Sequence, residues 1–302
     1  MQLPVQSQST IYAEPWEAGA GAEDLAEIAR AADRAGFAYL ASCDHVAIPR
    51  RLAGAMSTVW YDPVATLSFL AGITERVLLL SHVAVVGLRH PLATAKQYAT
   101  LDHLSGGRLI LGVGAGHVAE EFEALGVDFA RRGAVLDETI DALRAALGTE
   151  EYPEFAGQRF SFSGLGQRPR PAQPQIPLWV GGSSPAAVRR AAVRGDGWLP
   201  QGDPRTELPA QIAKLRAHRQ EAGITEPIEI GAITEPLYVG DATWEVGRRT
   251  LSGKPDAIAE SLRAYAAMGV HQIQVRFRSR SRAELIDQMA AFGADVASHL
   301  NT

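Results

Sequence analysis

The sequence predicts a single α/β domain folded as a (β/α)8 barrel, or TIM barrel, with insertions. Apolar runs rich in β-branched residues alternate with helical patterns along the whole chain, which is typical of parallel strands joined by helices. The chain has 302 residues, 46% of them hydrophobic, and one such barrel uses about 250 residues. We therefore expect one domain over residues 1–302, with an open doubly wound sheet as the alternative.

Eight apolar runs are expected to form the strands. They lie at residues 3–8, 37–42, 77–86, 108–113, 177–181, 197–200, 228–233 and 270–277. The part of the chain between positions 77 and 113 reads as strand, helix and strand within about forty residues, which indicates a parallel βαβ unit.

Two helices have clear boundaries in the sequence. The first spans residues 22–35, where apolar side chains recur at the i, i+3, i+4 and i+7 positions of one face, and Gly36 ends it. The second opens at Pro91, where a missing N–H is harmless, and runs to about residue 104, before a Gly-Gly pair.

Two stretches interrupt the alternation. Residues 148–175 show aromatic and polar residues in alternation and then a proline-rich passage, which predicts a small hairpin and an extended link. We interpret this stretch as an insertion within the domain. The second interruption is the loop at about residues 238–252.

Composition and charge argue against several classes of function. The formal net charge is -5 and the 29 Lys and Arg residues are scattered, which argues against a nucleic-acid partner. No apolar run approaches about 18 residues and the first residues do not resemble a signal peptide, so we expect no membrane partner. The single cysteine, Cys43, forbids an internal disulfide and suits the cytoplasm. The histidines show no metal-ligand spacing, so no metal site is expected.

Motifs between residues 78 and 126 resemble the luciferase-like flavin and deazaflavin oxidoreductases. These motifs are R-H-P at 89–91, A-x-L-D-x-L-S-G-G-R at 99–108, G-V-G-A-G at 112–116 and E-E-F-x-x-L-G at 120–126, followed by P-L-W-V-G-G-S-S at 177–184 and G-D-G-W-L-P at 195–200. The resemblance is strong over about residues 20–200 and nearest to the branch that uses coenzyme F420. It implies a (β/α)8 barrel, often a homodimer, that transfers a hydride between the deazaflavin C5 and a small organic substrate.

Barrel enzymes place their active sites at the carboxyl ends of the strands, and Asp44 and His45 follow the second expected strand. The residues alone allow a loop-capping aspartate and a solvated histidine. The resemblance implies that Asp44 contacts the cofactor and that His45 faces the substrate as a proton donor or acceptor.

Ser81, His82 and Val83 stand at the end of the third expected strand. The resemblance places here a non-prolyl cis peptide that forms a bulge behind the cofactor ring. The chain departs from the family pattern, because His82 stands where Gly or Ser usually precedes the valine. His82 is either at the edge of the ring or a buried structural histidine.

The loop after the fourth expected strand contains Gly112, Gly114 and Gly116, followed by His117. Glycines let the backbone approach a flat cofactor or its phosphates, and their spacing is not that of the dinucleotide fingerprint. The resemblance implies that these glycines contact the cofactor and that His117 faces the substrate, with a surface histidine as the alternative. His117 is therefore the second candidate catalytic residue.

The fifth expected strand ends in Gly181, Gly182, Ser183 and Ser184, which open a helix. Free amides at a helix N-terminus form an anion site, so we expect the cofactor phosphate there. Ordinary capping of the helix by Ser184 is compatible with this.

Arg276 and Arg278 alternate with apolar residues in the last expected strand, so both point to one face. That face is either the mouth of the barrel, where the arginines would suit an anionic group, or the solvent.

Two other functions remain open from the sequence. One is an FMN-dependent monooxygenase of the same family, in which reduced flavin activates oxygen. The other is a non-catalytic barrel that only binds flavin or F420.

Overall fold

The computed structural model describes residues 1–10, 13–202 and 204–300. Its centre is a seven-stranded sheet in the order β1-β2-β3-β6-β7-β8-β11, in which every pair of neighbours is parallel. The strands are β1 (Tyr39–Ser42), β2 (Leu78–Ser81), β3 (Leu109–Val113), β6 (Leu178–Gly181), β7 (Gly197–Leu199), β8 (Glu229–Ile233) and β11 (Gln272–Gln274). Strand order follows chain order, so each strand is joined to the next by a helical crossover.

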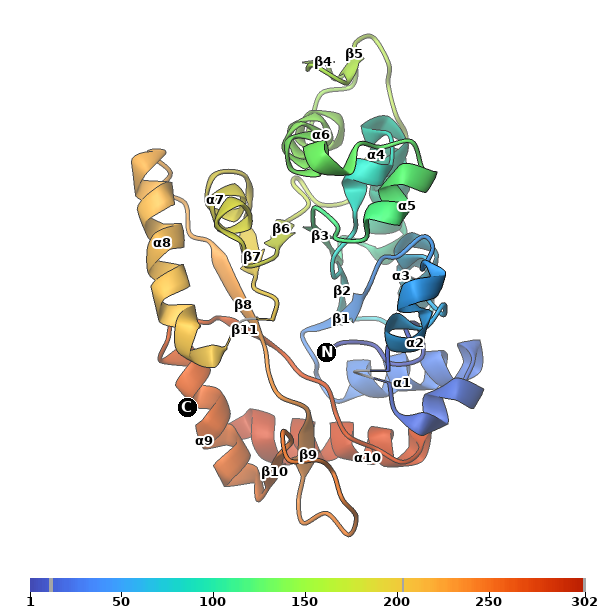
Figure 1. Cartoon of the computed structure of the whole chain (residues 1–302), viewed down its shortest axis with the longest axis vertical. Helices are drawn as coiled ribbons and strands as arrows, with labels where there is room; N and C mark the ends of the chain where they lie inside the picture. The colour runs from blue at the N-terminus through green and yellow to red at the C-terminus, as the bar shows by residue number, and fades with distance from the viewer. Residues whose placement is uncertain (11–12, 203, 301–302) are drawn as a thin grey trace.

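The helices surround the curled sheet (Figure 1). They are α1 (Ala22–Arg34), α2 (Ala53–Met56), α3 (Pro63–Ala71), α4 (Pro91–Ser105), α5 (Ala119–Ala124), α6 (Arg132–Leu147), α7 (Pro185–Arg194), α8 (Leu208–Glu221), α9 (Pro255–Ala266) and α10 (Arg282–Ala291). The two helices with clear sequence boundaries are confirmed. Gly106, in the left-handed conformation with φ of 69°, ends α4 as a C-cap. In the described ranges, no helix is long and apolar enough to cross a membrane.

The eighth position of the ring is filled by residues 1–3. The Leu3 amide donates to the Ala41 carbonyl at 3.0 Å, and the Gln2 amide donates to the Val275 carbonyl at 3.1 Å. These bonds link the two edges of the sheet, and α1 follows as the eighth helix of the pattern. The (β/α)8 prediction is therefore confirmed, with a short pairing segment in place of one strand.

Three expected strands differ clearly from the prediction, and the strand expected at residues 270–277 covers only Gln272–Gln274. The strand expected at residues 3–8 is wrong, because Pro4 has no N–H to donate and Val5 has a φ of 68°, outside the β region. The strand expected at residues 77–86 covers only Leu78–Ser81, and a cis bond between His82 and Val83 follows it.

The interruptions of the pattern have their own small sheets. Within the expected insertion, β4 (Phe155–Ala156) and β5 (Ser161–Phe162) pair antiparallel, which confirms the hairpin. The loop near residue 240 holds an unexpected parallel pair, β9 (Leu237–Val239) with β10 (Leu251–Gly253).

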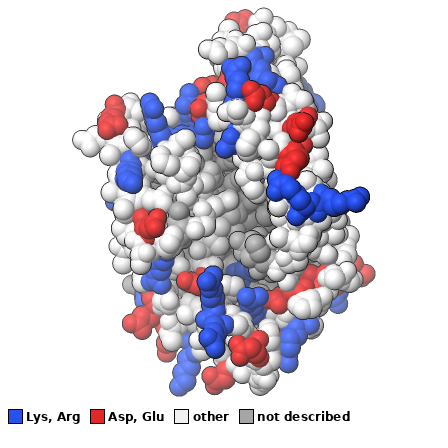
Figure 2. Space-filling model, in the orientation of Figure 1, with Lys and Arg blue, Asp and Glu red and all other residues white. Residues whose placement is uncertain are grey.

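The core has two layers, because alternate side chains of each strand point to opposite faces. The larger layer packs between the sheet and the helices, and Leu40 belongs to it. The smaller layer fills the barrel and consists of Tyr39, Ala41, Leu80, Ile110, Trp179 and Leu199. The face drawn in Figure 2 is hollowed near its centre, and the charged side chains are spread around the hollow.

Candidate active site at the carboxyl ends of the strands

Asp44 ties the loop after β1 to the loop after β2. Its side chain is 2% exposed, and it accepts hydrogen bonds from the Val85 amide at 2.8 Å and from both terminal nitrogens of Arg89 at 2.7 and 2.9 Å. Burial alone would lower the pKa of Arg89, but the hydrogen bond and charge of Asp44 raise it overall. Arg89 is thus a partner in a largely buried ion pair.

His45 is held by Glu121 of α5. The Nδ1 of His45 lies 2.8 Å from one carboxylate oxygen of Glu121. The other oxygen accepts the amides of Val46 at 2.7 Å and Ala47 at 3.1 Å. The sequence motif E-E-F-x-x-L-G contained Glu121, but nothing local in the motif shows that this side chain reaches back to the loop after β1.

The two predicted catalytic histidines lie together. The rings of His45 and His117 are 5.3 Å apart and nearly perpendicular, and Trp60 contacts His45 from another side at 4.5 Å. Burial, and then the neighbouring His45, lower the pKa of His117 against the opposing effect of Glu121. Burial alone would raise the pKa of Glu121, but the hydrogen bonds from His45 and the two amides lower it overall. The site therefore combines an ionised carboxylate with neighbouring imidazoles.

The bond between His82 and Val83 is cis, as the resemblance implied. Ser81 supports the bulge, because its hydroxyl donates to the Gly112 carbonyl at 2.9 Å and accepts the Gly112 amide at 3.0 Å. His82 is 6% exposed. Burial, and then the charge of the α-amino group of Met1, lower the pKa of His82 to about 4. His82 is thus a buried neutral histidine, and its Nε2 lies 3.3 Å from the side-chain nitrogen of Gln201.

Glycines at or just past the ends of β3 and β6 make room for the bulge. A Cβ on Gly114 would lie 2.4 Å from one methyl of Val83, and a Cβ on Gly181 would lie 2.6 Å from the other. A Cβ on Gly112 would meet the Ser81 carbonyl oxygen at 2.0 Å. Any side chain at these three positions is therefore excluded by the protein's own packing, and contact of the glycines with a cofactor stays a prediction.

Helix α7 begins beside this bulge with its first amides partly free. The Gly182 amide donates to the Leu199 carbonyl at 2.9 Å, and the Ser184 hydroxyl caps the helix by accepting the Ala187 amide at 3.2 Å. The Ser183 hydroxyl accepts the Gln201 amide at 2.8 Å. In the part of the chain that the structure describes, the amides of Ser183 and Ser184 have no hydrogen-bond acceptor. Free amides at a helix N-terminus suit an anion, and binding of the cofactor phosphate here stays a prediction.

Gln201, which the sequence did not single out, joins the loops after three strands. It lies just past β7 and contacts both His82 of the β2 loop and Ser183 of the β6 loop. A polar residue past a short strand was the signal that could have identified it.

Arg276 and Arg278, which follow β11, face acidic partners within the protein. Arg276, with a side chain 11% exposed, pairs with Glu17 at 3.2 Å, and Arg278 pairs with Glu14 at 2.9 Å. Burial lowers the pKa of Arg276 despite these carboxylates. The solvent-facing alternative is therefore wrong for Arg276, which is buried.

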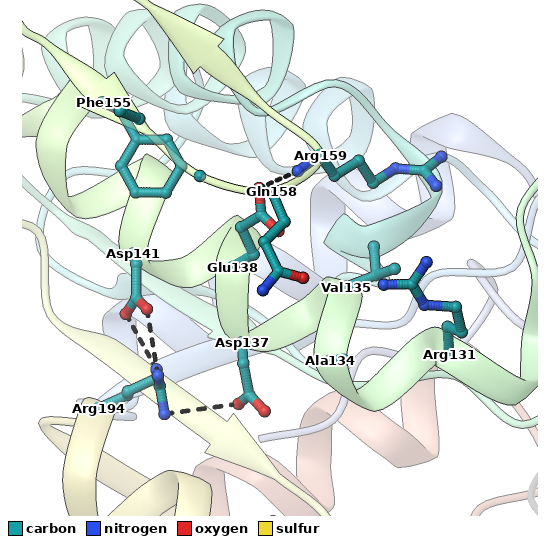
Figure 3. A pocket seen from close by; sticks show the side chains of 12 residues that line it. Arg131, Ala134, Val135, Asp137, Glu138, Asp141, Phe155, Gln158, Arg159 and Arg194 are labelled. Carbon is teal, nitrogen blue, oxygen red and sulfur yellow. Dashed lines mark hydrogen bonds and ion pairs between the residues drawn. The ribbon is translucent and has the colours of Figure 1, made fainter.

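A groove of about 590 Å³ between α6 and the β4–β5 hairpin is separate from these loops (Figure 3). Part of its charge is paired within the protein: Arg194 bonds Asp141 at 2.9 Å and approaches Asp137 at 3.7 Å. Glu138 accepts the backbone amide of Arg159 at 2.7 Å. Its lining contains none of the residues that follow the barrel strands. Throughout the described ranges, no group of three or more His, Cys, Asp or Glu side chains is arranged to hold a metal ion.

Comparisons with known proteins agree with this fold. The model of the luciferase-like monooxygenase family matches residues 1–246. The uncharacterized protein Rv0940c of Mycobacterium tuberculosis is 36% identical over 222 residues, covering 68% of this chain and 75% of its own length.

Two solved structures share the fold. The monooxygenase RslO1 from Streptomyces bottropensis has a TM-score of 0.79 at 23% identity, covering 92% of this chain and 93% of its own. An F420-dependent secondary alcohol dehydrogenase in complex with an F420-acetone adduct has a TM-score of 0.77 at 16% identity, covering 92% and 94%. The extent of the family match, together with the curled parallel sheet, shows that the chain belongs to the luciferase-like monooxygenase family.

Proposed function

We propose that this protein is an F420-dependent oxidoreductase that transfers a hydride between the deazaflavin C5 and a small organic substrate. The observation that carries the proposal is the placement of His45 beside His117 at the strand ends, with its ring held by Glu121. Hydride transfer to or from a carbon that bears oxygen needs a partner for the proton of that oxygen, and a histidine titrates close to neutrality.

The residues past the strands suit a flat cofactor with an anionic tail. Val83 offers a half-buried apolar surface on the bulge, next to the interior layer of the barrel. The amides of Ser183 and Ser184 suit a phosphate, and the loop that holds Gly112, Gly114 and Gly116 runs next to the bulge. Asp44 would support cofactor binding mainly by holding the loops after β1 and β2 together.

Bound F420 would supply a two-electron hydride acceptor or donor at C5. For an alcohol substrate, His45 would accept the hydroxyl proton as the carbon–oxygen double bond forms. The reverse reaction returns the proton from His45 to the carbonyl oxygen. The His117 ring lies 5.3 Å from the His45 ring, and His117 is the second candidate for proton transfer.

An FMN-dependent monooxygenase is the second candidate function. The match to the luciferase-like monooxygenase family supports it, and a monooxygenase, RslO1, is among the structural neighbours. The two candidates need different cofactors, because reduced FMN activates oxygen and the carbon at the corresponding position of F420 prevents productive oxygen chemistry.

Equilibrium titration of the purified protein with F420 and with FMN tests the proposal. We expect F420 to bind at least tenfold more tightly, about 1.4 kcal/mol. Equal or reversed affinities would contradict the F420 assignment and favour the monooxygenase.

Reduction of F420 by propan-2-ol is the first activity to measure, because a structural neighbour carries an F420-acetone adduct. We also propose that the chain is a cytoplasmic homodimer, and light scattering of the purified protein tests the dimer.

A further inference from the structure

Glu121 sits where it controls the chemical state of His45. It lies on α5 and is 5% exposed, and its two carboxylate oxygens have different partners. One oxygen faces the His45 Nδ1 at 2.8 Å, while the other accepts two consecutive backbone amides of the loop after β1. The carboxylate therefore fixes the backbone and the ring of the same loop together.

An ionised carboxylate can only accept hydrogen bonds. Two backbone amides already donate to Glu121, and these bonds favour its charged form. The 2.8 Å contact with His45 then requires a proton on Nδ1. In neutral imidazole one nitrogen is a donor and the other an acceptor, so the lone pair of His45 is left on Nε2.

The other two rings that contact His45 fix the plane of its imidazole. They do not compete with Glu121 in setting which nitrogen carries the proton. Trp60 packs against it edge-on at 4.5 Å, and His117 lies at 5.3 Å. Glu121 and His117 are the titratable groups that face His45 in the described residues. His117 has its pKa lowered, chiefly by burial, so it adds little positive charge at neutral pH.

We infer that Glu121 is a positioning residue that holds His45 as the Nδ1–H tautomer and so makes Nε2 the atom that exchanges the proton with the substrate. This inference rests on the proposed function for its catalytic consequence. The tautomer itself is a property of the protein without cofactor or substrate. In serine proteases, a buried carboxylate sets the tautomer of a catalytic histidine in the same way.

The Glu121→Gln variant separates this role from simple support of the loop. Glutamine has the same shape, and its oxygen can still accept the Val46 and Ala47 amides. Its NH2 group, however, donates to Nδ1 and so forces the proton of His45 to Nε2. The matched control is Glu120→Gln, which removes the neighbouring carboxylate of α5, whose partner is the exposed Arg51 at 2.5 Å.

The first measurement is ¹⁵N NMR of histidine-labelled protein at neutral pH, with His45 assigned by its loss in His45→Ala. We expect a protonated Nδ1 in the wild-type protein and in Glu120→Gln, and a protonated Nε2 in Glu121→Gln. A protonated Nε2 in the wild-type protein, or the same tautomer in all three proteins, would overturn the inference. The wild-type spectrum decides even if the Glu121→Gln variant does not fold.

The second measurement is the single-turnover reduction of F420 by propan-2-ol. We expect Glu121→Gln to slow this step at least tenfold with F420 affinity unchanged, and Glu120→Gln to leave both unchanged. A slow His45→Ala beside a Glu121→Gln of wild-type rate would overturn the inference and leave the proposed function intact. Wild-type rates in both variants would contradict proton transfer through His45, and with it the catalytic part of the inference. If the wild-type protein binds F420 without oxidising propan-2-ol, the tautomer measurement alone decides the inference.

Discussion

The two sides of the candidate site are built by different kinds of interaction. Around Val83, the arrangement is steric: two glycines leave the space that its methyl groups occupy. Around His45, the arrangement is polar: a buried carboxylate and two backbone amides hold one ring. We therefore expect that a methyl group added beside Val83 disturbs the steric side. Moving the proton of His45 from one ring nitrogen to the other should disturb the polar side.

The largest expected effect is on the polar side. Replacing His45 by Ala should slow the chemical step by roughly 10²–10⁴, the usual scale of general acid–base catalysis, because the proton acceptor is lost. Affinity for F420 should stay within a few-fold. Single-turnover reduction of F420 by propan-2-ol measures both quantities.

His218→Ala, on the exposed surface of α8, is the control and should behave as the wild-type protein. Because the His117 ring lies 5.3 Å from His45, the double variant with His117→Ala must accompany the single one. A wild-type rate in the double variant would exclude histidine acid–base catalysis.

The steric side is tested by Gly114→Ala. The added Cβ would lie 2.4 Å from a methyl of Val83, so the bulge or the loop must shift, and overpacking of this kind typically costs about 1–3 kcal/mol. The free energy of unfolding in urea measures this cost. Gly54→Ala is the control, because nothing lies within 4 Å of its added Cβ, and it should be neutral or slightly stabilising. Equal stability of the two variants would show that Val83 does not require the glycine.

The sequence predicted the steric side better than the polar one. The glycines and the Ser81-His82-Val83 segment form a local motif, and the cis bond implied by the resemblance is present. The barrel could likewise be predicted, because each strand and helix leaves a periodic pattern. The Glu121–His45 contact could not be predicted, because the two residues lie 76 positions apart and the contact depends on how α5 packs against the loop after β1. The partners of Asp44 and Arg276 could not be predicted for the same reason.

The lowered pKa of the buried His82, next to Val83, predicts a pH effect on the stability of the protein. Its pKa is about 4 in the folded protein, against about 6.5 in an unfolded chain. The unfolded chain takes up a proton below about pH 6.5 while the folded protein does not, so stability is full above that pH and is lost as the pH falls toward 4. The loss is at most about 1.4 kcal/mol per pH unit, or about 1–2 kcal/mol between pH 6.5 and 5.

Urea unfolding of His82→Gln at several pH values isolates this contribution. The carboxylates of the protein titrate in both proteins, and glutamine can keep a hydrogen bond to Gln201. The variant should therefore lose stability less steeply than the wild-type protein between pH 6.5 and 5. Identical slopes would mean that His82 is protonated in the folded protein as easily as in the unfolded chain.

The smallest expected effect concerns the phosphate at the start of α7. Gly182 is a poor place to test it, because its φ of 107° strains any side chain. Ser184→Asp is better, since aspartate caps a helix as well as serine does and the helix N-terminus tolerates the negative charge. A bound phosphate would be repelled by that charge, so F420 affinity should fall by about 1 kcal/mol, roughly fivefold, while the free energy of unfolding stays unchanged.

Ser281→Asp makes the same change at the cap of α10, where Ser281 accepts the Glu284 amide at 3.1 Å, and should leave F420 affinity unaltered. The loss in Ser184→Asp should also shrink as salt is raised, because salt screens exposed charges. Equal affinity in the two variants would place the phosphate elsewhere.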